Sequence, residues 1–193
     1  MRSLGPQCTP FQMKITSAVI QSLVLDPKHS LLNVRQCSYL LEYFKLLATN
    51  DGASLDDIQF RAFLLCSTDL TNSKAERVFE LFDVDRSGSV EFDEFYFIVC
   101  ILAAVYSNSE KRFLNRHWRA CFELLDEDGS NSVSVAEFET LGFLFGFSRG
   151  SIQKIFDDFD VSGNQELEIE EFRLFVLAAL DAEKGYVLPN SNM

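Results

Sequence analysis

Hydrophobic and polar positions follow one another in a repeated unit: an apolar stretch with helical spacing, a short polar segment, and a second apolar stretch. Near its end each polar segment contains an isolated apolar residue, which a phenylalanine follows five positions later. Four copies align on these two positions, with the pairs Leu55 and Phe60, Val90 and Phe95, Val133 and Phe138, and Leu167 and Phe172. The longest interval separates the second copy from the third. The repeat therefore predicts four helix-loop-helix units arranged as two pairs.

The segment before the first copy predicts a separate helix. It carries an apolar stripe at intervals of four residues, made of Phe11, Ile15, Val19 and Leu23. Thr9-Pro10 is a helix start signal, and Asp26-Pro27 is a stop signal. We expect residues 1–30 to form a tail and this additional helix, which either packs on the N-terminal half or holds a partner.

The second polar segment, Asp83–Glu94, has the ligand spacing of an EF-hand calcium loop. Ca²⁺ takes roughly six to eight oxygen ligands. Gly88 stands at the sharp turn, where a residue without Cβ is favoured. The predicted donors are Asp83, Asp85, Ser87, Ser89 through its carbonyl, Glu91 and Glu94. A folded hand that binds no metal is the alternative interpretation.

Two further loops, Asp126–Glu137 and Asp160–Glu171, keep most of this pattern. The predicted donors of the third loop are Asp126, Asp128, Ser130, Ser132 and Glu137, with Asn131 at the turn. Those of the fourth loop are Asp160, Ser162, Asn164, Glu166, Glu168 and Glu171, with Gln165 at the turn. A register that starts at Asp158 would place Gly163 at the turn but Ile169 at the last ligand position, so we reject it. The first loop, Ala48–Gln59, has no carboxylate at either end, and we interpret it as a metal-free partner for the second.

These units predict an all-α, calmodulin-like fold of two EF-hand pairs with an extra N-terminal helix. The N-terminal lobe is expected at 31–106, with hands at 48–59 and 83–94. The C-terminal lobe is expected at 107–182, with hands at 126–137 and 160–171, followed by a flexible tail at 183–193. The apolar run Phe95–Tyr106 is shorter than the about 20 residues that a bilayer-spanning helix needs. It predicts a buried helix, either between the lobes or beside a groove that another protein fills.

Composition narrows the class of function. The chain has 193 residues and a net charge of −12, which disfavours nucleic-acid binding and suits cations or basic partners. Five scattered cysteines indicate reduced thiols. Arg2 after Met1 excludes N-myristoylation, and Lys14 interrupts any secretory core. His29 and His117 belong to no catalytic constellation. We therefore expect a cytoplasmic protein that is not an enzyme, does not insert into a membrane and uses Ca²⁺ as its cofactor.

Two functions fit this sequence: a calcium sensor that controls a partner, and a structural subunit in which calcium is incidental. Promiscuous sensors rely on flexible methionine-rich grooves. This chain has only three methionines and nineteen phenylalanines. The composition therefore favours a dedicated sensor with a fixed protein partner.

From about Leu32 to Asp181 the chain resembles the EF-hand calcium-binding domain-containing protein 9 family of sperm flagella. The matching segments are Asn33-Val34-Arg35, Glu42-Tyr43-Phe44, Phe95-Tyr96, Val99-Cys100, Arg116-His117, Phe122–Asp126 and Phe143-Leu144-Phe145. The resemblance implies a calcium and pH sensor in the flagellum that binds a small auxiliary subunit of the CatSper calcium channel and, through it, the channel. The alternatives are a calmodulin-like or calcineurin-B-like regulator of another target and an axonemal structural subunit.

A pH response implied by the resemblance would have two sources in this sequence. Affinity for Ca²⁺ should rise with pH wherever an empty loop still holds protons, above all at the crowded Asp83–Glu94 loop. His117 is the second expected contributor, since histidine titrates near neutrality.

Overall fold

The computed structural model describes residues 13–48 and 53–183. Three predicted features lie at least partly outside this range: the start of the N-terminal helix at Thr9-Pro10, residues 49–52 of the first loop, and the tail beyond residue 183. Among the helices of the described residues, none has the length and apolar character that crossing a bilayer requires.

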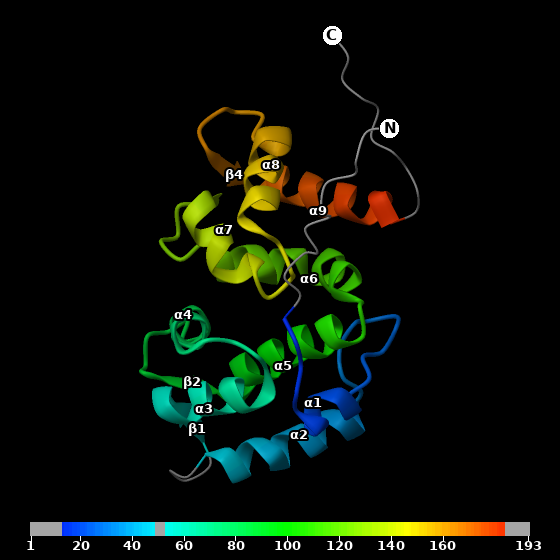
Figure 1. The fold of residues 1–193 in the computed structure, drawn as a ribbon, viewed down its shortest axis with the longest axis vertical. Coiled ribbons are helices and arrows are strands. Elements are labelled where there is room, and N and C mark those ends of the chain that lie inside the picture. Colours follow the sequence, from blue (N-terminus) through cyan, green and yellow to red (C-terminus); the bar gives the residue numbers. More distant parts are fainter. Residues whose placement is uncertain (1–12, 49–52, 184–193) are drawn as a thin grey trace, which may run out of the picture.

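The described chain is mostly helical, as the sequence predicts, with four three-residue strands (Figure 1). The elements in order are α1 (Ala18–Ser22), α2 (Val34–Leu47), β1 (Ser54–Asp56), α3 (Asp57–Ser67), α4 (Asn72–Phe82), β2 (Ser89–Glu91), α5 (Phe92–Tyr106), α6 (Glu110–Leu125), β3 (Ser132–Ser134), α7 (Val135–Gly142), α8 (Arg149–Phe159), β4 (Glu166–Glu168) and α9 (Ile169–Glu183).

The strands join the loops in two antiparallel pairs. β1 pairs with β2, and Leu55 lies opposite Val90; β3 pairs with β4, and Val133 lies opposite Leu167. These four side chains are the isolated apolar residues of the repeat, and each is completely buried. The register follows because a shift of one residue would turn each of them to the opposite face of its sheet.

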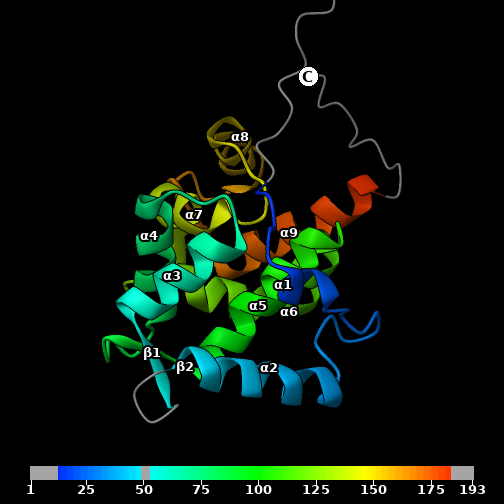
Figure 2. The ribbon, with the colours of Figure 1, turned by 60° about the horizontal axis from the view of Figure 1, so that its bottom comes forward.

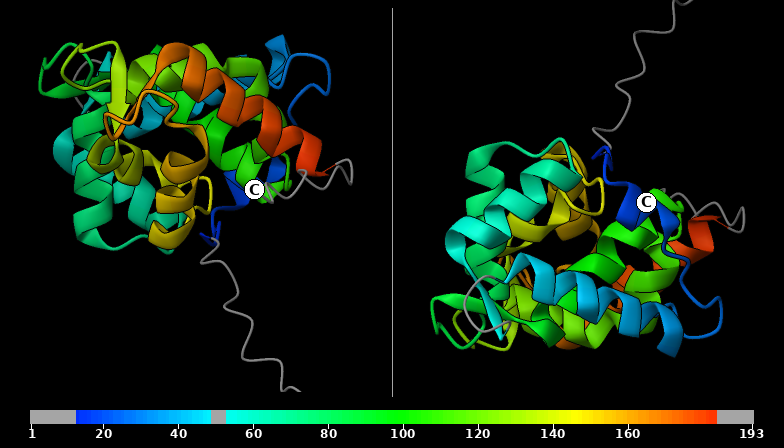
Figure 3. Two further views of the ribbon diagram at one scale, coloured as in Figure 1. Left: turned by 90° about the horizontal axis from the view of Figure 1, so that it is seen from above. Right: turned by 90° about the horizontal axis from the view of Figure 1, so that it is seen from below.

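Helix α5 lies at the centre of the molecule. In Figure 1 it runs between α1 and α2 below it and α6 above it, and Figure 2 shows α2 below α5 from another side. Every residue from Ile98 to Val105 is buried. The predicted apolar helix is therefore covered by other elements of this chain. Seen from above, α9 runs across α6 and completes the C-terminal half (Figure 3).

The N-terminal segment corrects one prediction. In the described part of this segment, from residue 13, the helix is confined to Ala18–Ser22, while Ile15 forms an isolated antiparallel bridge with Thr68. The Thr16 N–H donates to the Ser67 carbonyl over 2.8 Å, and Ile20, not Val19, is the fully buried residue of the short helix. A four-residue spacing is an even number, so it fits the alternation of an extended segment as well as a helical stripe. The segment packs on the N-terminal half, which was one of the two expected outcomes.

His117 connects α6 to the loop that precedes α2. Its ring lies 4.7 Å from the ring of Phe113, centroid to centroid, and its Nε2 lies 3.0 Å from the His29 carbonyl oxygen. A carbonyl oxygen only accepts, so Nε2 carries the proton and donates. The backbone of α6 is non-helical at His117, with φ −117° and ψ 23°, which bends the helix at this contact.

Acid should destabilise the fold at His117, because protonation places a charge on a partly buried ring. Burial lowers the pKa of His117 below its ordinary 6.5; the Arg116 charge adds to the effect, and hydrogen bonds to the His29 and Ser30 backbone oppose it. A lowered histidine pKa contributes stability that is complete above about pH 6.5 and is lost as the pH falls through the folded-state pKa. We expect the free energy of unfolding to fall as the pH drops below about 6.5, and to fall less in His117→Gln. Urea unfolding at several pH values measures this, with His29→Gln as control. Parallel curves for wild type and His117→Gln would contradict it.

Candidate calcium sites

The second, third and fourth loops share one hydrogen-bond framework at their first position. In each loop one oxygen of the first aspartate accepts the backbone N–H of the sixth residue. Asp83 accepts from Gly88 over 3.0 Å, Asp126 from Asn131 over 3.0 Å, and Asp160 from Gln165 over 2.8 Å. The aspartate therefore points into its loop, and the fourth loop starts at Asp160 as predicted.

The glutamate at the last position closes each loop with both carboxylate oxygens. One oxygen of Glu94 accepts the Val84 N–H over 3.3 Å, and the other accepts the Glu91 N–H over 2.8 Å. Glu137 and Glu171 make the equivalent pairs of bonds to the second and ninth residues of their own loops. The last glutamate, which can offer both carboxylate oxygens to a cation, is thus held across the loop from the first aspartate.

Each of these loops contains two left-handed residues, at its fourth and sixth positions. They are Arg86 and Gly88 in the second loop, Gly129 and Asn131 in the third, and Gly163 and Gln165 in the fourth. Glycine occupies one of the two positions in every loop, and a residue with a side chain occupies the other. A left-handed conformation costs such a residue about 1–2 kcal/mol. The fourth loop keeps its glycine at the fourth position, which compensates in part for Gln165 at the sixth.

In the second and third loops the predicted serine donors bond one another, whereas Glu91 of the second loop is exposed. The Ser87 hydroxyl donates to the Ser89 carbonyl over 2.9 Å, and Ser130 donates to the Ser132 carbonyl over 3.1 Å. In the described residues, the group of carboxylates that could hold one ion is Asp126, Asp128 and Glu137, whose oxygens lie within 4.8 Å of one another. The close grouping of its carboxylates therefore favours tighter Ca²⁺ binding in the third loop, whereas the larger number of carboxylates favours tighter binding in the second. All these donors are hard oxygens, which suits Ca²⁺.

The fourth loop is held by internal bonds. One oxygen of Asp160 accepts from the Ser162 hydroxyl and from the N–H groups of Gly163 and Asn164. The side chain of Glu166 accepts a hydrogen bond from the Ser132 hydroxyl over 2.5 Å, across the β3–β4 pair. Glu168 is exposed. The third and fourth loops are thus linked by a side-chain bond as well as by their strands.

Ionisation of the loop carboxylates follows their surroundings. Hydrogen bonds from Ser87 lower the pKa of Asp85, and those from Ser130 lower the pKa of Asp128. Glu94 differs, because burial raises its pKa; the Asp93 and Asp85 charges act in the same direction, and the backbone N–H groups of Glu91 and Val84 oppose them. Of these three carboxylates, Glu94 is the one whose pKa is raised, so its ionised form is disfavoured in the empty loop. A bound cation would offset the cost of ionising it.

The end of the first loop lies within the described residues and is capped by side chains. Ala48 ends α2, and Asp56 caps α3 by accepting the Gln59 N–H over 2.8 Å. The side-chain carbonyl oxygen of Gln59 accepts the Asp56 N–H over 3.0 Å, as the last glutamate does in the other loops. Ser54, two residues before Asp56, belongs to β1. Because Gln59 is uncharged, the last position of the first loop provides no carboxylate clamp.

A polar cleft of about 110 Å³ separates the start of the second loop from the start of the third. Asp83, Val84 and Arg86 line one side, and Asp126 and Glu127 line the other. Cations bound in these two loops would face each other across the cleft.

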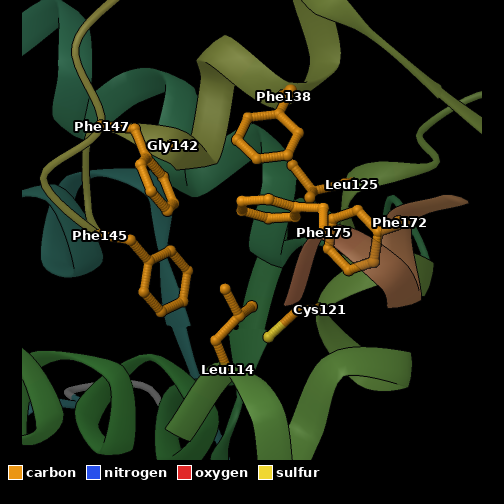
Figure 4. A pocket seen from close by; sticks show the side chains of 9 residues that line it. All are labelled: Leu114, Cys121, Leu125, Phe138, Gly142, Phe145, Phe147, Phe172 and Phe175. Atoms are coloured by element: carbon orange, nitrogen blue, oxygen red, sulfur yellow. The ribbon is translucent and has the colours of Figure 1, made fainter. Parts of the chain in front are cut away.

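The C-terminal half encloses an apolar interior behind the third and fourth loops. Figure 4 shows aromatic rings from α7, α9 and the segment after α7 converging on α6. The residues that line this space are Leu114, Cys121, Leu125, Phe138, Gly142, Phe145, Phe147, Phe172 and Phe175. The cavity left between them is only about 10 Å³, so the interior is closed in this structure.

Strand-paired loops with oxygen donors at these positions, flanked by helices, define a calcium-binding EF-hand protein. Comparison with known families agrees: residues 115–177 match the EF-hand domain pair, and residues 75–99 match the EF hand. The matches therefore support Ca²⁺ as the cation that this protein binds. The particular EF-hand family within this superfamily is not fixed by these matches.

Known relatives are calcium-binding proteins of several kinds. An uncharacterized calcium-binding protein of Caenorhabditis elegans is 27% identical over 70% of this chain and 58% of its own length. Calcium-dependent protein kinase 11 of rice is 25% identical over 73% of this chain and 23% of the kinase. Calcineurin B of Candida glabrata is 27% identical over 81% of this chain and 87% of its own length. The chain thus spans less than two thirds of the worm protein and of the kinase.

Proposed function

We propose that this protein is a calcium sensor that acts as a regulatory subunit and has no catalytic activity. The observation that carries the proposal is the closed aromatic interior of the C-terminal half, which lies directly behind two calcium loops joined by β3 and β4. In sensor EF-hands, a bound cation changes the angle between the flanking helices and exposes such an interior to a target. Ligands from Asp126, Asp128 and Glu137 would hold the cation, and α6 and α7 would move.

Exposure of this interior is testable with an apolar fluorescent dye. We expect dye fluorescence to rise several-fold in Ca²⁺ relative to chelator, because the cavity of about 10 Å³ has no room for a dye until the helices separate. Glu137→Gln should reduce the response, since it removes the third-loop clamp beside the interior. Equal dye binding in Ca²⁺ and chelator, together with an unchanged partner affinity, would instead support a structural subunit.

For the partner we propose the flagellar CatSper-type channel complex, reached through a small auxiliary subunit, with pH-dependent sensing at the sperm tail. The resemblance to the EF-hand calcium-binding domain-containing protein 9 family supports this partner. The alternative is a calcineurin-B-like regulator of another target, and the extent of the match to the Candida glabrata protein supports it. Purification of the complex from native tissue, in Ca²⁺ and in chelator, separates them. Recovery of axonemal proteins or of another target, without channel subunits, would overturn the channel proposal.

A further inference from the structure

Helix α4 and helix α7 meet between the two halves of the molecule, away from the chain connection between α5 and α6. Arg77 Nη2 on α4 donates to the Thr140 hydroxyl on α7 over 3.1 Å, and Lys74 Nζ lies 4.8 Å from the ring centre of Phe143. We name these four residues the α4–α7 contact.

Both sides of the contact are held in place. Thr140 is 6% exposed, and its hydroxyl donates to the Ala136 carbonyl over 3.1 Å while it accepts from Arg77. The Arg77 guanidinium is anchored on its own helix by Glu80, with Nη1 and Oε2 3.0 Å apart. A donor fixed at one end and an acceptor fixed at the other make a contact that depends on the relative position of the two helices.

Each side of the contact belongs to a different calcium loop. Helix α4 leads into the second loop, and α7 leads out of the third. We propose that the α4–α7 contact is a latch that couples these two loops, an inference that rests on the proposed sensor function. The loop that binds Ca²⁺ first changes the orientation of its helix and breaks the α4–α7 contact. The other loop then fills without that cost, so the two loops bind Ca²⁺ with positive coupling.

The polar cleft between the second and third loops predicts negative coupling of Ca²⁺ binding. Cations in the second and third loops would repel each other across it, and each would lower the affinity of the other loop. The latch and direct repulsion are therefore distinguished by whether silencing one loop weakens or strengthens the other.

Calorimetric Ca²⁺ titration of the full chain tests the latch. Glu94→Gln silences the second loop, and the affinity of the remaining sites is compared with wild type. We expect these sites to weaken about fivefold, the scale of one lost contact of this kind. Thr140→Val removes the hydroxyl and keeps the shape of the side chain. In that background, Glu94→Gln should change the affinity of the remaining sites by less than about twofold.

Arg77→Gln is a second, exposed variant that should abolish the coupling without endangering the fold. Arg119→Gln is its matched control, because Arg119 pairs with Glu123 on α6, which leads into the third loop, over 3.2 Å. Remaining sites that are unchanged or tighter in Glu94→Gln, or coupling that persists in Thr140→Val, would overturn the latch. The dye response of wild type tests the sensor function separately, since a chain can respond to Ca²⁺ without coupled loops.

Discussion

Replacing Glu94 by Gln removes the calcium site that we expect to be the tightest in this protein. The second loop offers four carboxylates, at Asp83, Asp85, Glu91 and Glu94, whereas the third offers three. Affinity in these loops is set largely by the charge of the ligands and the rigidity of the site. The amide keeps one oxygen and the shape but loses the charge and the bidentate clamp. We expect the affinity of this loop to fall at least about a hundredfold.

Calorimetry of wild type and Glu94→Gln measures this loss, and Glu137→Gln is the matched control in the third loop. Both glutamates accept backbone bonds from the second and ninth residues of their loops, and Glu137 also accepts a bond from the Ser134 hydroxyl over 2.7 Å. The comparison decides between ligand charge and preassembly. If Glu137→Gln removes the tightest site and Glu94→Gln does not, then the close grouping of Asp126, Asp128 and Glu137 outweighs the extra carboxylate.

The repeat in the sequence predicts the strand pairing well, because burial of Leu55, Val90, Val133 and Leu167 leaves one workable register. It also predicts a helix over Glu110–Leu125, where α6 lies, but not the bend at His117. The N-terminal segment was harder to predict. Its backbone bonds go to Ser67 and Asp69, about 50 residues away, and a local pattern carries no information on such partners.

The turn chemistry of the calcium loops shows a second limit. The sequence pattern considers glycine at the sixth position only. Gln165 at that position therefore indicates an uncompensated cost of a left-handed backbone. The structure shows that the fourth position is left-handed as well, with φ 73° at Gly163. The signal was present in the sequence, since Gly129 and Gly163 each stand two residues before the expected glycine.

Contacts between the halves give no periodic signal. Arg77 and Thr140 are polar residues 63 positions apart, and each sits within an ordinary amphipathic helix. His117 and its partner His29 are 88 positions apart. Sequence patterns identify the helices that carry these residues but not the orientation of one pair of hands against the other.

Replacing Phe95 by Ala should cause the largest loss of stability of any substitution considered. Phe95 is completely buried, and its ring lies 4.8 Å from that of Phe63 and 5.1 Å from that of Phe44, centroid to centroid. The three rings come from α5, α3 and α2, so Phe95 joins the helices that flank the first and second loops. Truncation of a buried phenylalanine costs about 3–5 kcal/mol, through lost burial and the cavity left behind.

Urea unfolding in chelator measures this cost, and Tyr106→Ala on the same helix is the control. Tyr106 is 46% exposed, so its truncation should change the free energy of unfolding far less, by about 0.5 kcal/mol. Ca²⁺ should restore part of the stability of Phe95→Ala, because a cation that binds the folded chain shifts the equilibrium toward it. A loss below about 1 kcal/mol in chelator would mean that the N-terminal half can close around the cavity. The cluster of Phe44, Phe63 and Phe95 would then contribute little to the packing of the first hand against the second.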